Sequence, residues 1–121
     1  MNNPLVLIIE DDKDVAELYR HALESSGVEA EIVRTGEDAL ARLAVTVPNL
    51  VLLDLKLQPH ISGADILRHI RSDRRLAKIR VIVMTGHHDM AEAVKAEADL
   101  ILIKPVDVIE LIDSVARFLQ Y

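Results

Sequence analysis

The stretch Leu5-Val6-Leu7-Ile8-Ile9-Glu10-Asp11-Asp12 joins five consecutive aliphatic residues to three acidic ones. A short aliphatic run without polar alternation is typical of a parallel strand that is buried on both faces. Similar runs occupy residues 50–53, 81–84 and 100–103. A further run at residues 30–33 contains Glu31 and follows Glu29, so it has the pattern of an edge strand. The sequence therefore predicts five strands.

Amphipathic stretches separate these runs. Apolar residues recur at helical spacing from Val15 to Leu23, and Gly27 can end that helix. The pattern over residues 90–98 is weaker, and three other helices begin at recognisable caps. The expected caps are Thr35, Ser62 with Asp65, and Asp107 with Glu110. Five strands alternating with five helices predict an α/β fold, a doubly wound five-stranded parallel sheet with helices on both faces.

The composition narrows the class of protein. The chain has 121 residues, of which 50 % are hydrophobic and 28 % charged, as expected for one globular domain. It lacks cysteine, which excludes disulfides, thiolate zinc sites and cysteine nucleophiles. A net charge of −6 offers no basic excess for phosphate backbones, so we expect no direct binding to nucleic acid. No apolar run approaches about 18 residues and no signal peptide is evident, so we expect a cytoplasmic protein that does not enter the membrane.

Polar residues follow four of the five runs. Ligands of such sheets bind outside the carboxyl ends of the strands, so residues that end different strands share one edge. In chain order they are Glu10, Asp11 and Asp12; Asp54; Thr85 and Gly86; and Lys104 and Pro105. We therefore expect carboxylates, a hydroxyl and a lysine to converge on this edge.

This set of groups indicates phosphoryl chemistry. Oxygen ligands alone suit a hard cation such as Mg²⁺ (or Mn²⁺), which retains open positions for phosphate oxygens. Lys104 adds a second positive charge, the hydroxyl of Thr85 can donate a hydrogen bond, and Gly86 leaves steric room. Asp54 stands alone after its strand and is the natural carboxylate nucleophile.

In this order the residues resemble the receiver domain of two-component response regulators, of the chemotaxis-regulator type, over essentially the whole chain. The stretches that carry the resemblance are residues 8–12, 52–57, 83–86 and 103–105. The resemblance implies a flavodoxin-like receiver topology. It also implies a single receiver domain over residues 1–121, with no output domain in this chain.

The resemblance assigns a role to each site residue. Asp54 matches the phosphoryl acceptor, Asp11 the direct Mg²⁺ ligand and Glu10 a second acid that often acts through water. The backbone carbonyl of Lys56 matches the third protein ligand, whereas Asp12 matches a residue outside the metal site.

Four further residues match the part of the site that contacts the phosphoryl group. Thr85 matches the hydroxyl that moves toward that group, Lys104 its salt-bridge partner and Gly86 a backbone contact. The bond from Lys104 to Pro105 is expected to be cis.

Receivers of this kind take the phosphoryl group from a histidine kinase or a histidine phosphotransfer protein. The resemblance implies a phosphoacceptor that assists its own phosphorylation and slow autodephosphorylation, not an enzyme acting on another substrate. Phosphorylation would change contacts with a downstream protein target, and a phosphorylation-dependent homodimer is a further possibility.

The chain departs from the receiver pattern at three places. Gln58 is an extra residue in the loop after Asp54, and the span from Thr85 to Lys104 is about one helical turn short, so the fourth helix should be short. Ile101 and Val106 stand where many receivers carry aromatic residues, so no aromatic switch is expected.

Three rival functions fit the sequence less well. A degenerate receiver that serves only as an interaction module is the first, and the intact acidic, hydroxyl and lysine set disfavours it. An aspartyl-phosphate phosphatase needs a second acid where Lys56 stands, and a flavin protein needs a phosphate loop where residues 10–14 are mostly acidic. The pair His87-His88 and the basic run from Arg68 to Arg80 fit a solvated loop and a solvated surface better than a metal or docking site.

Overall fold

The computed structural model describes residues 4–57 and 61–120. Its sheet has five parallel strands in the order β2-β1-β3-β4-β5, which confirms the predicted fold and the edge position of the second strand. The strands are β1 (Leu5–Ile9), β2 (Glu29–Val33), β3 (Leu50–Asp54), β4 (Arg80–Thr85) and β5 (Leu100–Ile103). Gln58, the predicted extra residue, lies outside the described residues.

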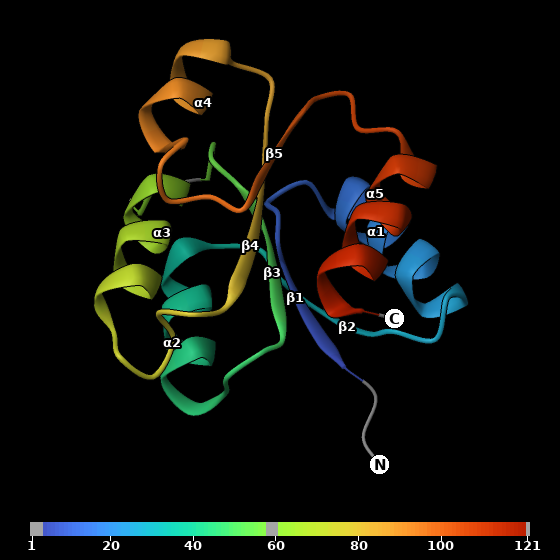
Figure 1. The fold of residues 1–121 in the computed structure, drawn as a ribbon, viewed down its shortest axis with the longest axis horizontal. Coiled ribbons are helices and arrows are strands. Elements are labelled where there is room, and N and C mark those ends of the chain that lie inside the picture. The colour runs from blue at the N-terminus through green and yellow to red at the C-terminus, as the bar shows by residue number, and fades with distance from the viewer. Residues whose placement is uncertain (1–3, 58–60, 121) are drawn as a thin grey trace.

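Helices cover both faces of the sheet, with α1 and α5 on one side and α2, α3 and α4 on the other (Figure 1). Their bounds are α1 (Lys13–Ser25), α2 (Gly36–Val45), α3 (Gly63–Ser72), α4 (His88–Val94) and α5 (Val108–Leu119). The fourth helix has only seven residues, as its short span predicts, although it begins two residues before the apolar pattern does. No helix in the described part of the chain is both long enough and apolar enough to cross a membrane.

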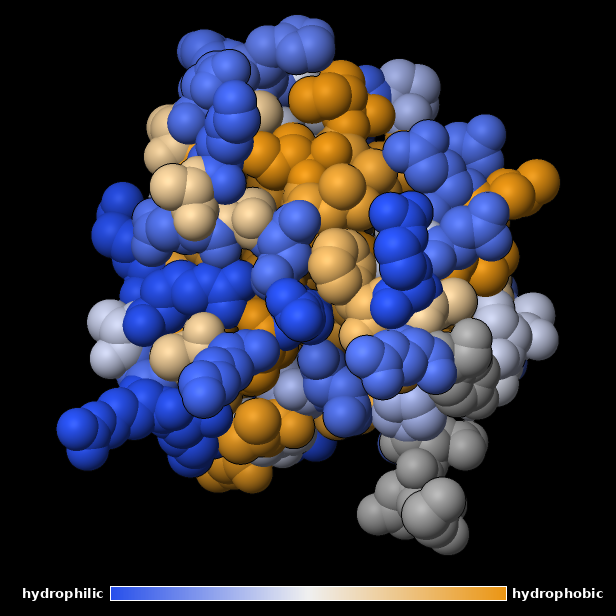
Figure 2. Space-filling view, viewed as in Figure 1, coloured by the Kyte–Doolittle hydropathy of each residue, from blue (hydrophilic) through white to orange (hydrophobic). Residues whose placement is uncertain are grey.

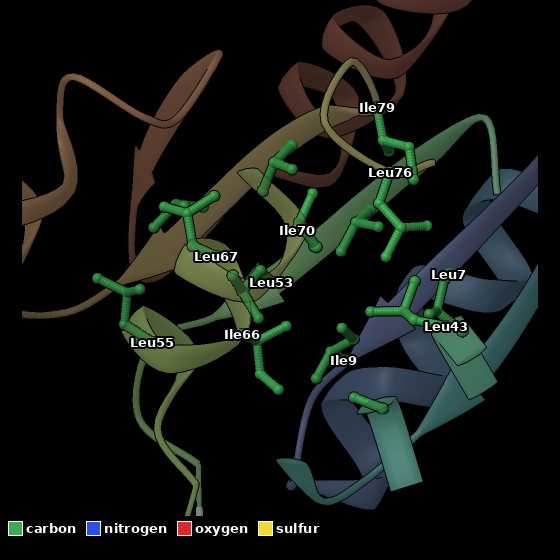
Figure 3. Packing of buried hydrophobic residues seen from close by; sticks show 14 of the residues in the cluster. Leu7, Ile9, Leu43, Leu53, Leu55, Ile66, Leu67, Ile70, Leu76 and Ile79 are labelled. Atoms are coloured by element: carbon green, nitrogen blue, oxygen red, sulfur yellow. The ribbon is translucent and has the colours of Figure 1, made fainter. Parts of the chain in front are cut away.

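The core is aliphatic and has two halves, because successive residues of a buried strand point to opposite faces. Leu7 and Ile9 join one half, which packs under α2 and α3, whereas Val6 and Ile8 join the other half under α1 and α5. Figure 3 shows the first half, with side chains of α3 meeting those of the strands. All five residues of β3 are buried, so the strand that ends at Asp54 is held on both faces.

The predicted caps hold the helices at the carboxyl edge of the sheet. Thr35 accepts a hydrogen bond from the Asp38 backbone, and Ser62 with Asp65 forms a reciprocal capping box. The Asp107 side chain accepts hydrogen bonds from the backbone N–H groups of Ile109 and Glu110, but the Glu110 side chain returns none within the described residues. Thus α5 has a simple cap and not the capping box that the sequence suggests.

The basic run from Arg68 to Arg80 is less solvated than the sequence suggests, because Arg71 is a structural residue. Its guanidinium donates to the backbone carbonyls of Ala77, Ile79 and Glu97 and forms a 2.9 Å ion pair with Asp99. Its side chain is only 21 % exposed. Arg71 therefore ties the end of α3 to the segments that precede β4 and β5.

Arg71→Ala should lower the free energy of unfolding by about 2–3 kcal/mol, since three carbonyls and one carboxylate lose a partly buried donor. Urea denaturation followed by circular dichroism measures this change. Arg68→Ala is the matched control, because the one ion pair of Arg68 within the described residues joins it to Asp65 on an exposed helix face. Equal unfolding midpoints for the two variants would contradict the structural role of Arg71.

Candidate functional site

Three carboxylates meet where β1 and β3 end. Glu10 follows β1 and is completely buried, Asp54 is the last residue of β3 and is 4 % exposed, and Asp11 is half-buried. Each offers an oxygen atom that lies within 4.8 Å of the other two. The acidic strand ends that the sequence predicts to converge are thus brought together by the parallel order of the sheet.

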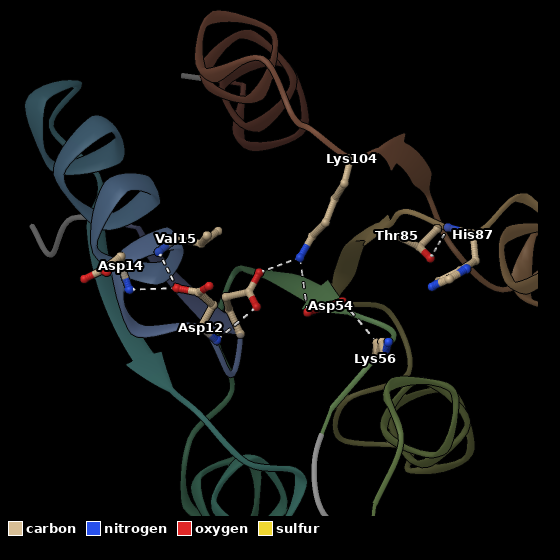
Figure 4. A network of polar contacts seen from close by, with 9 residues as sticks. Asp12, Asp14, Val15, Asp54, Lys56, Thr85, His87 and Lys104 are labelled. Carbon is tan, nitrogen blue, oxygen red and sulfur yellow. Dashed lines mark hydrogen bonds and ion pairs between the residues drawn. The ribbon is translucent and has the colours of Figure 1, made fainter.

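Lys104 crosses to these carboxylates from the end of β5 (Figure 4). Its Nζ lies 2.9 Å from Oε1 of Glu10 and 3.2 Å from Oδ2 of Asp54. The peptide bond from Lys104 to Pro105 is cis. One ammonium group therefore bridges the two most buried acids of the site.

The Asp54 carboxylate is held on its other side by the backbone. The N–H of Lys56 donates to Oδ1 of Asp54 over 3.0 Å. The next turn packs against the same strand end, where the N–H of Gly63 donates to the carbonyl of Leu55. An ideal Cβ on Gly63 would lie 2.4 Å from the Asp54 carbonyl oxygen, so only glycine allows α3 to begin this close.

The loop after β1 is fixed by its own acids. Asp12 caps α1 by accepting hydrogen bonds from the backbone N–H groups of Asp14 and Val15. The N–H of Asp12 donates to Oε2 of Glu10 over 3.2 Å. Asp12 is therefore a capping residue at the rim of the site.

Burial and neighbouring carboxylates raise the pKa values of Glu10 and Asp11. Burial raises the pKa of Glu10, and the neighbouring Asp54 carboxylate adds to the rise, which Lys104 partly offsets. Burial also raises the pKa of Asp11, and Glu10 adds to that rise. Burial acts to lower the pKa of Lys104, but the carboxylates of Glu10 and Asp54 outweigh it and leave that pKa above its usual value.

A divalent cation fits this donor set. Among the described residues, the ammonium that contacts this cluster of three carboxylates is that of Lys104, so the four side chains together carry a net charge of −2 when all are ionised. All the side-chain donors are oxygens, which Mg²⁺ and Mn²⁺ accept and which soft metals do not prefer. Glu10, Asp11 and Asp54 would hold such an ion.

A cleft of about 300 Å³ opens at this edge of the sheet. Lys56, Gly86 and His87 line it together with the acids and Lys104. Thr85 is 1 % exposed and does not line the cleft, and its hydroxyl accepts a hydrogen bond from the His87 backbone over 3.1 Å (Figure 4). The structure thus places Thr85 beside the site, with its hydroxyl engaged by the following loop.

Two residues near the site were missed in the sequence. Arg34 follows β2 at the same edge and donates to the Asp11 carbonyl. Tyr19 of α1 is buried and lines a groove with Lys104 and Pro105, and burial raises its pKa. The position of Arg34 directly after a strand places it at the same edge of the sheet and could have indicated its role. The sequence around Tyr19 indicates only that it belongs to the apolar face of a helix.

Comparison with known proteins identifies the family of this chain. Residues 6–116 match the family model for the response regulator receiver domain. The chain belongs to the response regulator receiver domain family.

Curated relatives contain a receiver as part of a longer protein. The phosphate regulon transcriptional regulatory protein PhoB of Rhizobium meliloti is 29 % identical over 120 residues, which is 97 % of this chain and 52 % of PhoB. A putative transcriptional regulator of Haloferax volcanii is 36 % identical over 115 residues, which is 95 % of this chain and 19 % of that protein. The chain therefore spans about half of the first protein and about a fifth of the second.

Solved receiver structures share the fold over at least nine-tenths of their length in the two cases that follow. A putative response regulator from Chloroflexus aurantiacus has a TM-score of 0.91 at 27 % identity, covering 99 % of this chain and 100 % of that one. The signal receiver domain of a putative LuxO repressor protein from Vibrio parahaemolyticus has a TM-score of 0.88 at 33 % identity, covering 98 % of this chain and 92 % of that one.

Among the described residues, the departures from the receiver pattern involve α4, β5 and the segment that follows β5. Figure 2 shows apolar side chains gathered between α4 and α5 on the face over β5. Ile101 is half-buried there, and Ile103 and Ile109 are exposed. Both histidines of the His87-His88 pair are exposed, but His88 begins α4, so the pair is not confined to a loop as the sequence suggests.

Proposed function

We propose that this receiver domain accepts a phosphoryl group on Asp54 in a Mg²⁺-dependent reaction and thereby switches its protein contacts. The observation that carries the proposal is the placement of Lys104. Its ammonium contacts Asp54 and Glu10, which belong to a cluster of three carboxylates whose oxygen atoms lie within 4.8 Å of one another. Such a set supplies a nucleophile, a cation site and a fixed positive charge at one point.

The donor would be a phosphohistidine of a histidine kinase or of a histidine phosphotransfer protein. A carboxylate oxygen of Asp54 forms a bond to phosphorus as the phosphorus–nitrogen bond to the donor imidazole breaks, and the imidazole nitrogen keeps the electron pair. Bound Mg²⁺ (or Mn²⁺) would offset the negative charge of the carboxylates and of the incoming phosphoryl oxygens.

The chain's own residues orient the acceptor. The N–H of Lys56 and the ammonium of Lys104 hold opposite oxygens of Asp54, so the carboxylate plane is fixed before the donor arrives. Lys104 stays beside the phosphoryl oxygens after transfer. The Gly86 backbone at the rim and the Thr85 hydroxyl, once released from the His87 N–H, supply hydrogen bonds to the same group.

This function requires a phosphoryl donor and a protein target, but no small-molecule substrate that the domain would convert. Slow hydrolysis of the acyl phosphate resets the domain, so the receiver is a phosphoacceptor and not an enzyme acting on other molecules. Its outputs would be contacts with a downstream protein target and, as one form of output, a phosphorylation-dependent homodimer. The alternative, a receiver that never accepts phosphate, leaves the Lys104 bridge and the three clustered carboxylates without a function.

The test uses the single acid in one tryptic fragment. Cleavage after Arg42 and Lys56 releases residues 43–56, in which Asp54 is the only carboxylate side chain. Incubation with acetyl phosphate and Mg²⁺ should add one phosphoryl mass to the intact chain. Borohydride reduction should then mark this fragment alone. No added mass, or a mark in another fragment, would overturn the proposal, and EDTA provides the metal-free control.

A further inference from the structure

Arg34 reaches from the loop after β2 to the loop after β1. Its Nε and Nη2 lie 3.2 Å and 3.1 Å from the backbone oxygen of Asp11. Two N–H groups of one planar guanidinium therefore converge on a single carbonyl. No carboxylate in the described residues lies within ion-pair distance of Arg34, so this carbonyl is its partner there.

The three acidic residues that follow β1, Glu10, Asp11 and Asp12, are each held by a different contact. The N–H of Glu10 donates to the carbonyl of Val33, which continues the pairing of β1 with β2. Asp12 is fixed as the cap of α1. Between them, the carbonyl of Asp11 accepts both of the hydrogen bonds that it makes within the described residues from Arg34. The orientation of Asp11 thus depends on a side chain from the neighbouring strand end.

We infer that Arg34 is a positioning residue for cation binding, which holds Asp11 so that its carboxylate faces Glu10 and Asp54. This inference rests on the proposed function, since it takes Asp11 as a ligand of the cation. An exposed arginine bonded to a carbonyl adds little to the stability of a fold. We expect Arg34 to affect cation binding instead, because Asp11 must keep its orientation to act as a ligand.

Arg34→Ala should raise the Mg²⁺ concentration that half-saturates the protein by about tenfold, the lower end of the usual cost of losing a group that supports a metal ligand. Arg34→Lys should fall between wild type and Arg34→Ala, because an ammonium reaches one carbonyl without the fixed fork of a guanidinium. Calorimetric titration with Mg²⁺ measures the binding. Arg34→Ala should be phosphorylated by acetyl phosphate more slowly than wild type at low Mg²⁺ concentration, and this difference in rate should shrink as the Mg²⁺ concentration is raised.

Arg74→Ala is the matched control, because Arg74 is exposed and has no hydrogen bond or ion pair within the described part of the chain. Both alanine variants should unfold in urea at the wild-type midpoint when Mg²⁺ is absent. Wild-type Mg²⁺ affinity in Arg34→Ala would overturn the inference and leave the proposed function standing. A lowered unfolding midpoint in that variant would overturn it as well, and a wild-type chain that binds no Mg²⁺ would overturn both.

Discussion

Asp54→Asn should abolish phosphorylation of the chain by acetyl phosphate. An amide oxygen is a far weaker nucleophile than a carboxylate, and the amide would also remove one of the three negative charges that attract the cation. The side chain keeps its size, and its oxygen can still accept the hydrogen bond from the Lys56 N–H. The loss should therefore be chemical, and it is measured as the fraction of chains that gain one phosphoryl mass.

The control for Asp54→Asn is the same substitution at an exposed aspartate outside the site. Asp113 is exposed on α5, so Asp113→Asn alters the net charge equally and should be phosphorylated as wild type. Circular dichroism should show the native spectrum for both variants. Phosphorylation of Asp54→Asn at the wild-type level would mean that another group accepts the phosphoryl group.

The acidic edge could be predicted because it depends on topology alone. Four aliphatic runs end in Glu10, Asp54, Thr85 and Lys104, and a parallel sheet places the carboxyl ends of all its strands on one side. Burial of β3 followed from its continuous apolar composition. These inferences need only the period of the sequence and the handedness of the connections.

Individual contacts could not be predicted, since they depend on side-chain reach and on competing partners. Lys104 contacts Glu10, which lies 94 positions earlier, as well as Asp54. The Thr85 hydroxyl is engaged by the His87 N–H, a local bond that competes with the site. Arg71 looks like one of several surface charges until the segments before β4 and β5 surround it with carbonyls.

Lys104→Met should slow phosphorylation at saturating Mg²⁺ by roughly a hundredfold, the usual cost of losing one preorganised charge from a transition state. The same change should tighten Mg²⁺ binding by about threefold to tenfold, because it removes the positive charge that contacts Glu10 and Asp54 in the cation-free protein. Methionine keeps the length and apolar stem of the lysine. Rapid-mix phosphorylation by acetyl phosphate and calorimetric titration with Mg²⁺ measure the two effects.

Slower phosphorylation combined with tighter Mg²⁺ binding distinguishes an electrostatic role of Lys104 from a folding defect in the variant. A misfolded edge would spread the three carboxylates and weaken the rate and the Mg²⁺ affinity together. Lys78→Met is the control, because Lys78 is exposed and lies before β4 at the other end of the sheet, so it should change neither quantity. Weaker Mg²⁺ binding in Lys104→Met, or an unchanged rate, would contradict the role of its ammonium. Tighter binding with slower transfer would mean that Lys104 acts on the phosphoryl group at the expense of affinity for the cation.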